Sequence, residues 1–561
     1  MSHALAPGVR TAAGLVAILL VALVGIPVLV ILTVSLRQSD GLIGVGNFLI
    51  AYSSARHVRA LVNSFELGLA VCAVAASMAL PLAWAVARTD IGGKHFIDLC
   101  AISVFLCPPY LNAVAWIFLA GPNAGLLNKA WVGMTGAAHP VLNIYSFSGI
   151  AFVMGSSLFF FVFSFTSTAL EAVSSDMEEA ASILGAGRWT TAIEITLPLV
   201  APAILAALVI VFLQAIALYG VPALLAYPAR FPLLVTSLLE FFDGMSVRLG
   251  PAAAYAMPLV LVTITLLAAQ KFLTRRRGYV MMTGKSGQRE LTKLGTLRLP
   301  ATIAAILLCG VIAVLPIVTL VQAAFSKAWG RGWQIDNFTL DNLLALASKP
   351  SLRDAVFHSI LYASASAVLA TAVSLAAAYL IVRQNIRLGF ALSLLAMMPS
   401  VIPAIVLSIG FYATFSAPPV SLYGTGLLLI LAFSARFLPI TYSACAAALV
   451  TFNPEMEDAA RILGASRLYV LARVTAPMLK SSILASTIMV FVLASHELST
   501  AVFLSNANNR VVSVAMLDFA DNGQMEAVAT MGVCLLLITL AILSLGSRIV
   551  GHSIMRARGE A

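Results

Sequence analysis

The amino-acid sequence predicts an all-α integral membrane protein with twelve transmembrane helices, arranged as two parallel repeats of six. Three observations lead to this fold class. Only 10% of the 561 residues are charged and 61% are apolar, whereas an average soluble domain carries roughly 25% charged residues. Long apolar runs recur along the chain, and one polar segment occurs twice. The shortage of charge excludes a water-soluble globular protein.

Each apolar run has about 20 residues or more, enough for a helix to cross a bilayer. The first six predicted spans cover residues 16–36, 63–87, 98–120, 148–170, 199–225 and 251–273. The second six cover residues 300–325, 356–382, 389–415, 424–450, 478–504 and 527–548. We therefore divide the chain into a first transmembrane repeat (1–275), a cytoplasmic linker rich in Lys, Arg and Gly (276–299) and a second transmembrane repeat (300–561).

The distribution of positive charge predicts the orientation of the chain. If the amino terminus lies inside, the loops on that side contain about twice as many Lys and Arg residues as the opposite loops. Such an excess is typical of the cytoplasmic side, so both termini are expected in the cytoplasm. The net charge of +10 is then a topological signal, and no nucleic-acid partner is needed to explain it.

The repeated polar segment reads EEAASILGAGR at 178–188 and EDAARILGASR at 457–467, with eight of eleven positions identical. Outside this segment, Arg88 and Thr196 of the first half align with Arg383 and Thr475 of the second. Acidic residues at the start favour the positive end of a helix dipole, and a glycine follows the apolar stripe as a helix terminator. Each copy therefore predicts a short amphipathic helix between two spans, available to a partner.

At these residues the sequence resembles the EAA loop of permeases from binding-protein-dependent ABC importers. The second copy departs mildly from the pattern, with Asp458 for the usual Glu and Ala476 for the usual Leu before proline. The residues assigned to ATPase coupling are Glu178, Glu179, Ala180, Ala181, Gly185 and Pro198 in the first copy, and Glu457, Asp458, Ala459, Ala460, Gly464 and Pro477 in the second. Pro198 and Pro477 are also expected to set the angle of the span that follows each loop.

This resemblance covers nearly the whole chain as two fused permease domains, and it implies the transmembrane fold of a type I ABC importer. Each loop would form a coupling helix on one of two cytoplasmic ATPase subunits, and a periplasmic binding protein would deliver a small solute. The chain would then be a multi-pass protein of the bacterial inner membrane and not an enzyme. It would hold no cofactor itself, since ATP and Mg²⁺ would bind to the partner subunits.

Three shorter strings resemble permeases of the ferric-iron type. They are RRRGY at 275–279 with TGK at 283–285, YGVPALL at 219–225 with FPLLVT at 231–236, and ELSTAVFL at 497–504. Ferric iron is the predicted substrate. Related permeases serve 2-aminoethylphosphonate, thiamine and polyamines, and these remain alternatives.

Four ionisable residues fall within the predicted spans and are candidates for the translocation path: Glu66, Arg436, His496 and Glu497. Such residues usually face a bundle interior or a water-filled path. Equally, Arg436 could pair with one of the carboxylates to close an interface, and His496 could make an ordinary polar contact. No metal site is predicted, because Tyr, Asp, Glu and His do not cluster in the sequence and the six cysteines form no C-x-x-C pair.

A different functional class is an ion-coupled secondary transporter with twelve helices, in which Glu66 or Glu497 would carry protons. The two EAA copies argue against it, because an ion-coupled carrier has no ATPase to dock. An integral-membrane enzyme is disfavoured as well, since the sequence has neither an H-E-x-x-H motif nor a G-x-S-x-G elbow.

Overall fold

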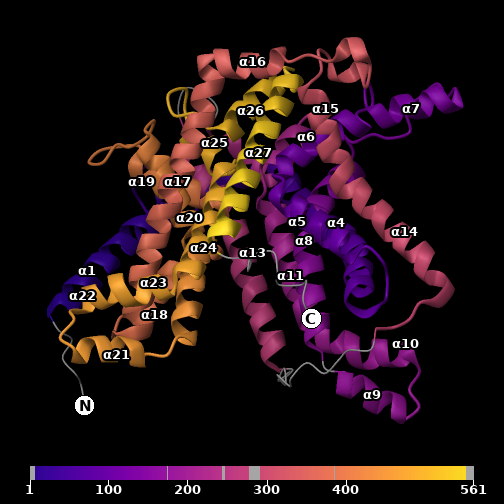
Figure 1. The fold of residues 1–561 in the computed structure, drawn as a ribbon. Coiled ribbons are helices and arrows are strands. Elements are labelled where there is room, and N and C mark those ends of the chain that lie inside the picture. Colours follow the sequence, from indigo (N-terminus) through magenta and orange to yellow (C-terminus); the bar gives the residue numbers. More distant parts are fainter. Residues whose placement is uncertain are drawn as a thin grey trace.

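The computed structural model describes residues 7–38, 40–173, 175–242, 247–276, 291–384 and 386–550. Over these residues it is built from helices, with only isolated β-bridges between loops (Figure 1). Nine of the described helices are long and apolar enough to cross a membrane, and twelve spans result if each of three bent helix pairs counts as one. The predicted all-α membrane fold is thus confirmed. Most of the predicted linker, residues 277–290, lies outside the described part of the chain.

The first repeat contains the π-helical turns η1 (Val21–Gly25), η2 (Ala192–Thr196) and η3 (Pro222–Ala226). Its α-helices are α1 (Pro7–Leu20), α2 (Ile26–Leu36), α3 (Gly46–Tyr52), α4 (Ala55–Arg88), α5 (Lys94–Leu106), α6 (Pro109–Ala120), α7 (Leu126–Thr135), α8 (Phe147–Ala172), α9 (Ser175–Ile183), α10 (Arg188–Thr191), α11 (Leu197–Ala217), α12 (Leu234–Leu239) and α13 (Leu249–Arg276).

The linker contains the short turn η4 (Gly295–Leu297), and the second repeat contains the short turns η5 (Gly310–Val314), η6 (Trp329–Arg331), η7 (Ile335–Asn337), η8 (Tyr379–Arg383), η9 (Met398–Ser400) and η10 (Leu471–Thr475). Its α-helices are α14 (Arg298–Cys309), α15 (Leu315–Ala324), α16 (Asp341–Ser348), α17 (Pro350–Ala378), α18 (Gly389–Met397), α19 (Ala404–Phe415), α20 (Gly426–Thr451), α21 (Glu455–Ile462), α22 (Arg467–Val470), α23 (Ala476–Met478), α24 (Lys480–Ser495), α25 (Ala501–Leu504), α26 (Val512–Asp521) and α27 (Met525–Val550).

The duplication seen in eleven residues extends through the helices of both repeats. The span Pro350–Arg383 has the same 34-residue length as α4, and α20 has the same 26-residue length as α8. The first repeat carries a longer connection before α8, and α7 occupies it. Structure is therefore preserved where the apolar sequences of the spans have diverged.

Three spans are broken by sharp bends. The bend is 105° between α5 and α6, 111° between Gly389–Ser400 and α19, and 73° between Leu471–Met478 and α24. Pro108 and Pro403 stand before α6 and α19 in extended conformation, with ψ of 136° and 143°. A proline lacks the N–H needed to continue a helix, so each proline separates two helical segments of one span.

The prolines after the loop helices behave differently from each other. Pro477 lies in α23 just before the 73° bend, as predicted. Pro198 does not break its span, because residues Trp189–Ala217 run as one helical span through it, and its effect on the angle of that span stays a prediction. Two predicted span ends also need correction. Helix α11 stops at Ala217 instead of reaching 225, and α24 stops at Ser495 instead of reaching 504.

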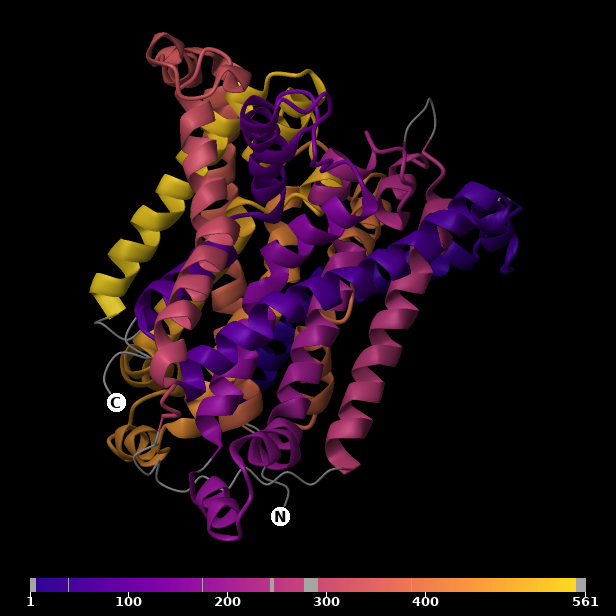
Figure 2. The same ribbon diagram turned by 90° about the vertical axis from the view of Figure 1, so that its right-hand side faces the viewer.

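The two repeats are interleaved through their first spans. Helix α2 packs on α19 of the second repeat and on α13 of its own, and α15 packs on α6 of the first repeat and on α27 of its own. Within each repeat the central spans form a bundle: α4, α8 and α11 in the first, and α17, α20 and α24 in the second. Figures 1 and 2 show α9 and α21 at one end of the molecule, which we name the loop face, and α7 and α16 at the other end, the opposite face.

The contact between α2 and α19 leaves no room for a side chain at Gly410. A Cβ atom there would approach the carbonyl oxygen of Pro27 to 2.5 Å. We expect Gly410→Ala to lower the thermal unfolding temperature of the purified protein, because overpacking costs about 1–3 kcal/mol. The matched control is Gly133→Ala in α7, where nothing lies within 4 Å of the new methyl group. Equal unfolding temperatures for the two variants would contradict the close packing of α2 on α19.

Candidate functional site

The two repeated segments form the short helices α9 and α21 on the loop face (Figure 1). Each ends at a glycine in the left-handed conformation, Gly185 with φ of 86° and Gly464 with φ of 88°. The next N–H closes the helix end, since Ala186 donates to the Ala181 carbonyl at 2.9 Å and Ala465 donates to the Ala460 carbonyl at 3.1 Å. This Schellman arrangement favours glycine at the turn, and it explains why both copies keep one.

In the first repeat, Glu178 turns inward and joins three elements. One of its carboxylate oxygens lies 3.0 Å from Nη1 of Arg88, the last residue of α4. The other accepts a hydrogen bond of 2.6 Å from Oγ1 of Thr196, at the base of α11. The Arg88 side chain is only 10% exposed. The loop helix is thus held to the ends of two spans by a charge-assisted contact.

The second repeat reproduces this arrangement. Oε1 of Glu457 lies 3.2 Å from Nε of Arg383 and accepts a hydrogen bond of 3.0 Å from Oγ1 of Thr475. Here both charged side chains are 11% exposed, so the pair is more deeply buried than in the first repeat. Arg383 also donates to the carbonyl of Phe452 at 2.8 Å. The internal alignment matches the arginine, glutamate and threonine of one repeat with those of the other. It does not indicate that the three side chains contact one another within each repeat.

The other face of each loop helix points away from the protein. Asp458 is exposed and pairs with Arg461 of its own helix at 3.3 Å. Ala180 and Ala459 are exposed too, whereas Ala181 is buried and Ala460 partly so. The side chain of Glu179 lies outside the described part of the chain. The apolar side chains at the ends of the two loop helices, Ile183, Leu184, Ile462 and Leu463, are each 85–88% exposed.

Near the middle of the molecule the two repeats touch where α11 and α24 end. A Cβ atom on Gly220 would lie 2.8 Å from Cβ of Tyr110 and 2.9 Å from Cδ2 of Leu498. The backbone N–H of Tyr219 donates to Oγ of Ser499 at 3.3 Å. The segments that follow α11 and α24 occupy equivalent positions in the two repeats, and they contact each other.

The structure places the four ionisable residues of the spans in different settings. Glu66 is exposed on α4. Nη1 of Arg436 donates to the carbonyls of Pro399 and Ile402, at 3.2 and 3.4 Å, where the second broken span leaves them free.

The remaining two follow the end of α24. Glu497 accepts from the N–H of Thr500 at 3.0 Å and interacts electrostatically with Arg436. No ion pair within 4 Å joins Glu497 to Arg436 in the described structure. His496 is partly buried, and its Nδ1 has no hydrogen-bond partner among the described residues.

A cavity of about 1080 Å³ lies between the repeats at the end of α4 remote from the loop face. Its walls come from the start of α4, from η3 to α12, and from α26 of the second repeat. The charged residues that line it are Arg56, Arg230, Glu240 and Asp521. From the sequence, none of these four residues was identified as part of a site. The two arginines were used only in the comparison of positive charge between the loops of the two sides. Burial, reinforced by the charge of Asp518, raises the pKa of Asp521.

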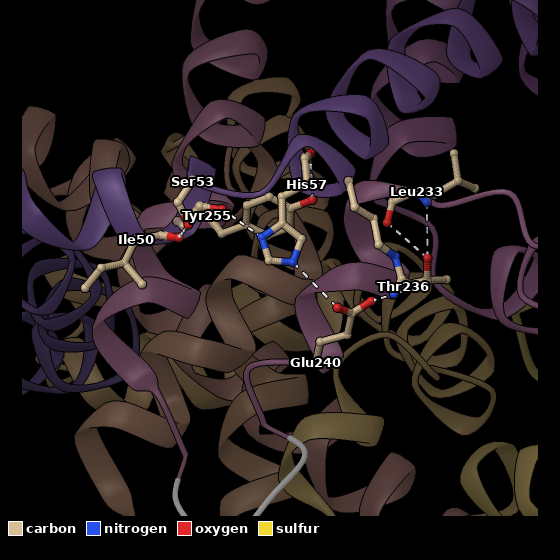
Figure 3. Close-up of polar contacts among 9 residues, drawn as sticks. Ile50, Ser53, His57, Leu233, Thr236, Glu240 and Tyr255 are labelled. Carbon is tan, nitrogen blue, oxygen red and sulfur yellow. Dashed lines mark hydrogen bonds and ion pairs between the residues drawn. The ribbon is translucent and has the colours of Figure 1, made fainter.

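Beside this cavity one carboxylate contacts both an arginine and a histidine. Oε1 of Glu240 lies 3.0 Å from Nη2 of Arg56, and Oε2 lies 3.5 Å from Nε2 of His57. Figure 3 shows His57 pointing toward Glu240 and lying close to Tyr255. Nδ1 of His57 faces the carbonyl of Ala51 at 2.8 Å. The start of α4 is thereby fixed to α12, which forms the wall across from it.

Among the described residues, no group of three or more His, Cys, Asp or Glu side chains is arranged to hold a metal ion. The polar groups of the cavity are instead mixed in charge, with two arginines and two carboxylates. This lining can attract a charged solute, but it does not offer the oxygen-rich shell of a tight metal site.

Comparison with known proteins links this architecture to transport. The chain is 26% identical over 415 residues to the ferric transport system permease protein FbpB of Actinobacillus pleuropneumoniae, covering 73% of this chain and 59% of that one. It is 26% identical over 432 residues to the putative ferric transport system permease protein FbpB 1 of Haemophilus influenzae, covering 76% and 66%. The chain therefore spans less than two thirds of the length of these two relatives.

A third relative matches only part of the chain. The putative 2-aminoethylphosphonate transport system permease protein PhnV of Salmonella paratyphi A is 25% identical over 246 residues, covering 44% of this chain and 92% of PhnV. The family described as "Binding-protein-dependent transport system inner membrane component" matches residues 6–279 and 369–557. The matched segments include both loop helices and make up most of the chain, which belongs to the family of inner-membrane components of binding-protein-dependent transport systems.

Proposed function

We propose that this chain is the transmembrane subunit of a bacterial ABC importer, in which α9 and α21 each dock on one cytoplasmic ATPase subunit. The observation that carries the proposal is the matched pair of apolar helix ends, Ile183 with Leu184 and Ile462 with Leu463, which are 85–88% exposed. Exposed apolar groups of this size on anchored helices favour an interface with another protein. ATP and Mg²⁺ would bind to the ATPase subunits, and a periplasmic protein would deliver the solute.

The orientation follows from the position of the inter-repeat linker. Its described end is held at the loop face, since Thr292 donates its N–H to the Arg88 carbonyl at 2.9 Å and Leu294 donates to Oδ1 of Asp90 at 2.9 Å. The linker is rich in Lys and Arg, and such segments stay in the cytoplasm. We infer that the loop face and both termini are cytoplasmic, and that the cavity between α4, α12 and α26 opens toward the periplasm.

Ferric iron is the proposed substrate, supported by the two FbpB relatives. The mixed charge of the cavity fits a path that binds weakly and leaves selectivity to the binding protein. Amino- and phosphonate-bearing solutes are the second candidate, because PhnV aligns with 44% of the chain and a cavity with both arginines and carboxylates can attract a zwitterion.

The test is reconstitution of the chain with its ATPase and binding protein in vesicles. ATP inside the vesicles should drive uptake of radioactive iron supplied with the binding protein, and ATPase subunits should co-purify with the chain. Uptake of 2-aminoethylphosphonate without uptake of iron would contradict iron as the substrate and would still support an ABC importer. Uptake that persists without ATP and collapses with the proton gradient would instead indicate an ion-coupled carrier and overturn the proposal.

A further inference from the structure

We propose that two triads of largely buried side chains are the joints that pass movement of the loop helices to the membrane spans. Triad one consists of Arg88, Glu178 and Thr196, and triad two consists of Arg383, Glu457 and Thr475. The six side chains are positioning residues, since they are argued to act through the helices they connect. The inference rests on the proposed function, because it assumes that ATPase subunits move α9 and α21.

Burial is the first argument. Most acidic residues near a protein surface remain solvated, yet Glu457 and Arg383 are each 11% exposed and Arg88 is 10% exposed. Removing two charges from water is costly, and a buried ion pair is often no more stabilising than an apolar pair. Stability alone therefore does not explain why both repeats keep the same pair while their spans have diverged. A requirement for one fixed orientation of each loop helix relative to its spans explains why both repeats keep the ion pair.

Geometry is the second argument. Each carboxylate bonds at once to the end of one long span and to the base of another. In triad one the Arg88 and Thr196 contacts use different oxygens of Glu178. In triad two both contacts use Oε1 of Glu457. A loop helix cannot shift relative to these spans without breaking both contacts, so span and loop helix move together.

Helix α4 extends the joint across the molecule. It runs without interruption from Ala55 to Arg88 over 34 residues, which corresponds to about 50 Å at 1.5 Å per residue. Its last residue is in triad one, and its second residue, Arg56, lines the cavity and pairs with Glu240. Displacement of α9 is therefore transmitted as a tilt of α4 to the cavity wall.

The two joints differ in stiffness. Arg383 has the additional bond to the Phe452 carbonyl, and Arg467 donates to Gln384 beside it. The side chain of Glu178 is 28% exposed, against 11% for Glu457. Water competes more easily for the first ion pair than for the second. Loss of triad two should consequently impair transport more than loss of triad one.

The experiment uses the complete complex of the chain, its ATPase and its binding protein in vesicles, and compares solute uptake with ATP hydrolysis. Glu457→Gln keeps the side-chain shape but removes its charge, and the matched control Glu455→Gln changes an exposed residue of the same helix. We expect complexes of normal yield in which uptake per ATP falls about tenfold for Glu457→Gln, the scale of one charge-assisted hydrogen bond. A smaller fall is expected for Glu178→Gln and none for the control.

Two further variants separate a joint from a simple stabilising contact. Thr475→Val removes one hydrogen bond at nearly constant volume and should lower uptake per ATP even if Glu457→Gln fails to assemble. The double substitution Arg383→Glu with Glu457→Arg exchanges the two charges. It should restore part of the uptake per ATP that Glu457→Gln loses.

The proposal is overturned if Thr475→Val and both Gln variants hydrolyse ATP and import solute in the wild-type ratio. It is also overturned if Thr475→Val lowers assembly and thermal stability without changing that ratio. Failure of the wild-type complex to form or to use ATP would count against the proposed function itself.

Discussion

Leu184→Ser combined with Leu463→Ser is expected to abolish ATP-driven uptake while the chain remains folded. Both leucines are almost fully solvent-exposed, at 87% and 88%, so their loss removes little packing within the chain. Burying one such side chain at an interface contributes about 1.5–3 kcal/mol. Each single replacement should weaken ATPase binding at least about tenfold, and the double replacement should leave both docking sites defective. The measurement is the amount of ATPase retained by the purified chain, together with uptake in vesicles.

The matched control for this prediction is Ile335→Ser. Ile335 is 92% exposed in η7, and η7 directly precedes α16, the helix that marks the opposite face. The control should retain ATPase like the unaltered chain. If the control and the double variant lose ATPase equally, general loss of solubility explains the result. If neither loses it, the exposed helix ends do not form the docking surface.

The second large effect is expected for Arg436→Met. This substitution keeps a long apolar side chain but leaves the carbonyls of Pro399 and Ile402 without the donor they now share. An unsatisfied buried carbonyl costs about 1–3 kcal/mol, so losing the donor of two carbonyls should lower the free energy of unfolding by about 2–6 kcal/mol. The fall should appear as a lower unfolding temperature in detergent. Glu66→Gln serves as the control, because Glu66 is exposed and such changes usually stay within about 0.5 kcal/mol.

The Arg436 experiment also distinguishes the two roles that the sequence left open. A stabilising role at the broken span predicts reduced stability with an unchanged KM for uptake. If instead stability is unchanged and KM rises, Arg436 contacts the solute and lines the path. The observed donation to two backbone carbonyls favours the first outcome.

The all-α membrane fold class, the number of spans and the internal duplication could be predicted because each depends on a pattern within a short stretch of sequence. A bilayer requires runs of apolar residues, and the repeated loop helices have acidic starts and glycine ends at the same positions. The bends were harder to locate, because a proline that breaks a helix and one that is accommodated look alike in sequence. Pro108 and Pro403 stand at breaks, whereas Pro198 lies within a continuous span.

The triads could not be predicted because their members are distant in the chain and their roles depend on which way each helix faces. Glu178 and Glu179 are neighbours in sequence, but a rotation of about 100° per helical residue separates their directions. Only the structure shows that Glu178 is the one bonded to Arg88. The charged cavity was missed for a related reason, since Arg56, Glu240 and Asp521 come from three separate elements.

The interleaving of the first spans has a consequence for biosynthesis. Helix α2 meets α19 at the contact between Pro27 and Gly410, so its partner in the second repeat is made about 380 residues later. At about 5–20 residues per second, the ribosome needs roughly 20–80 seconds to supply that partner. Helix α6 likewise waits for α15. The nascent first span must therefore remain stable among lipids for much of translation, which its almost wholly apolar sequence permits.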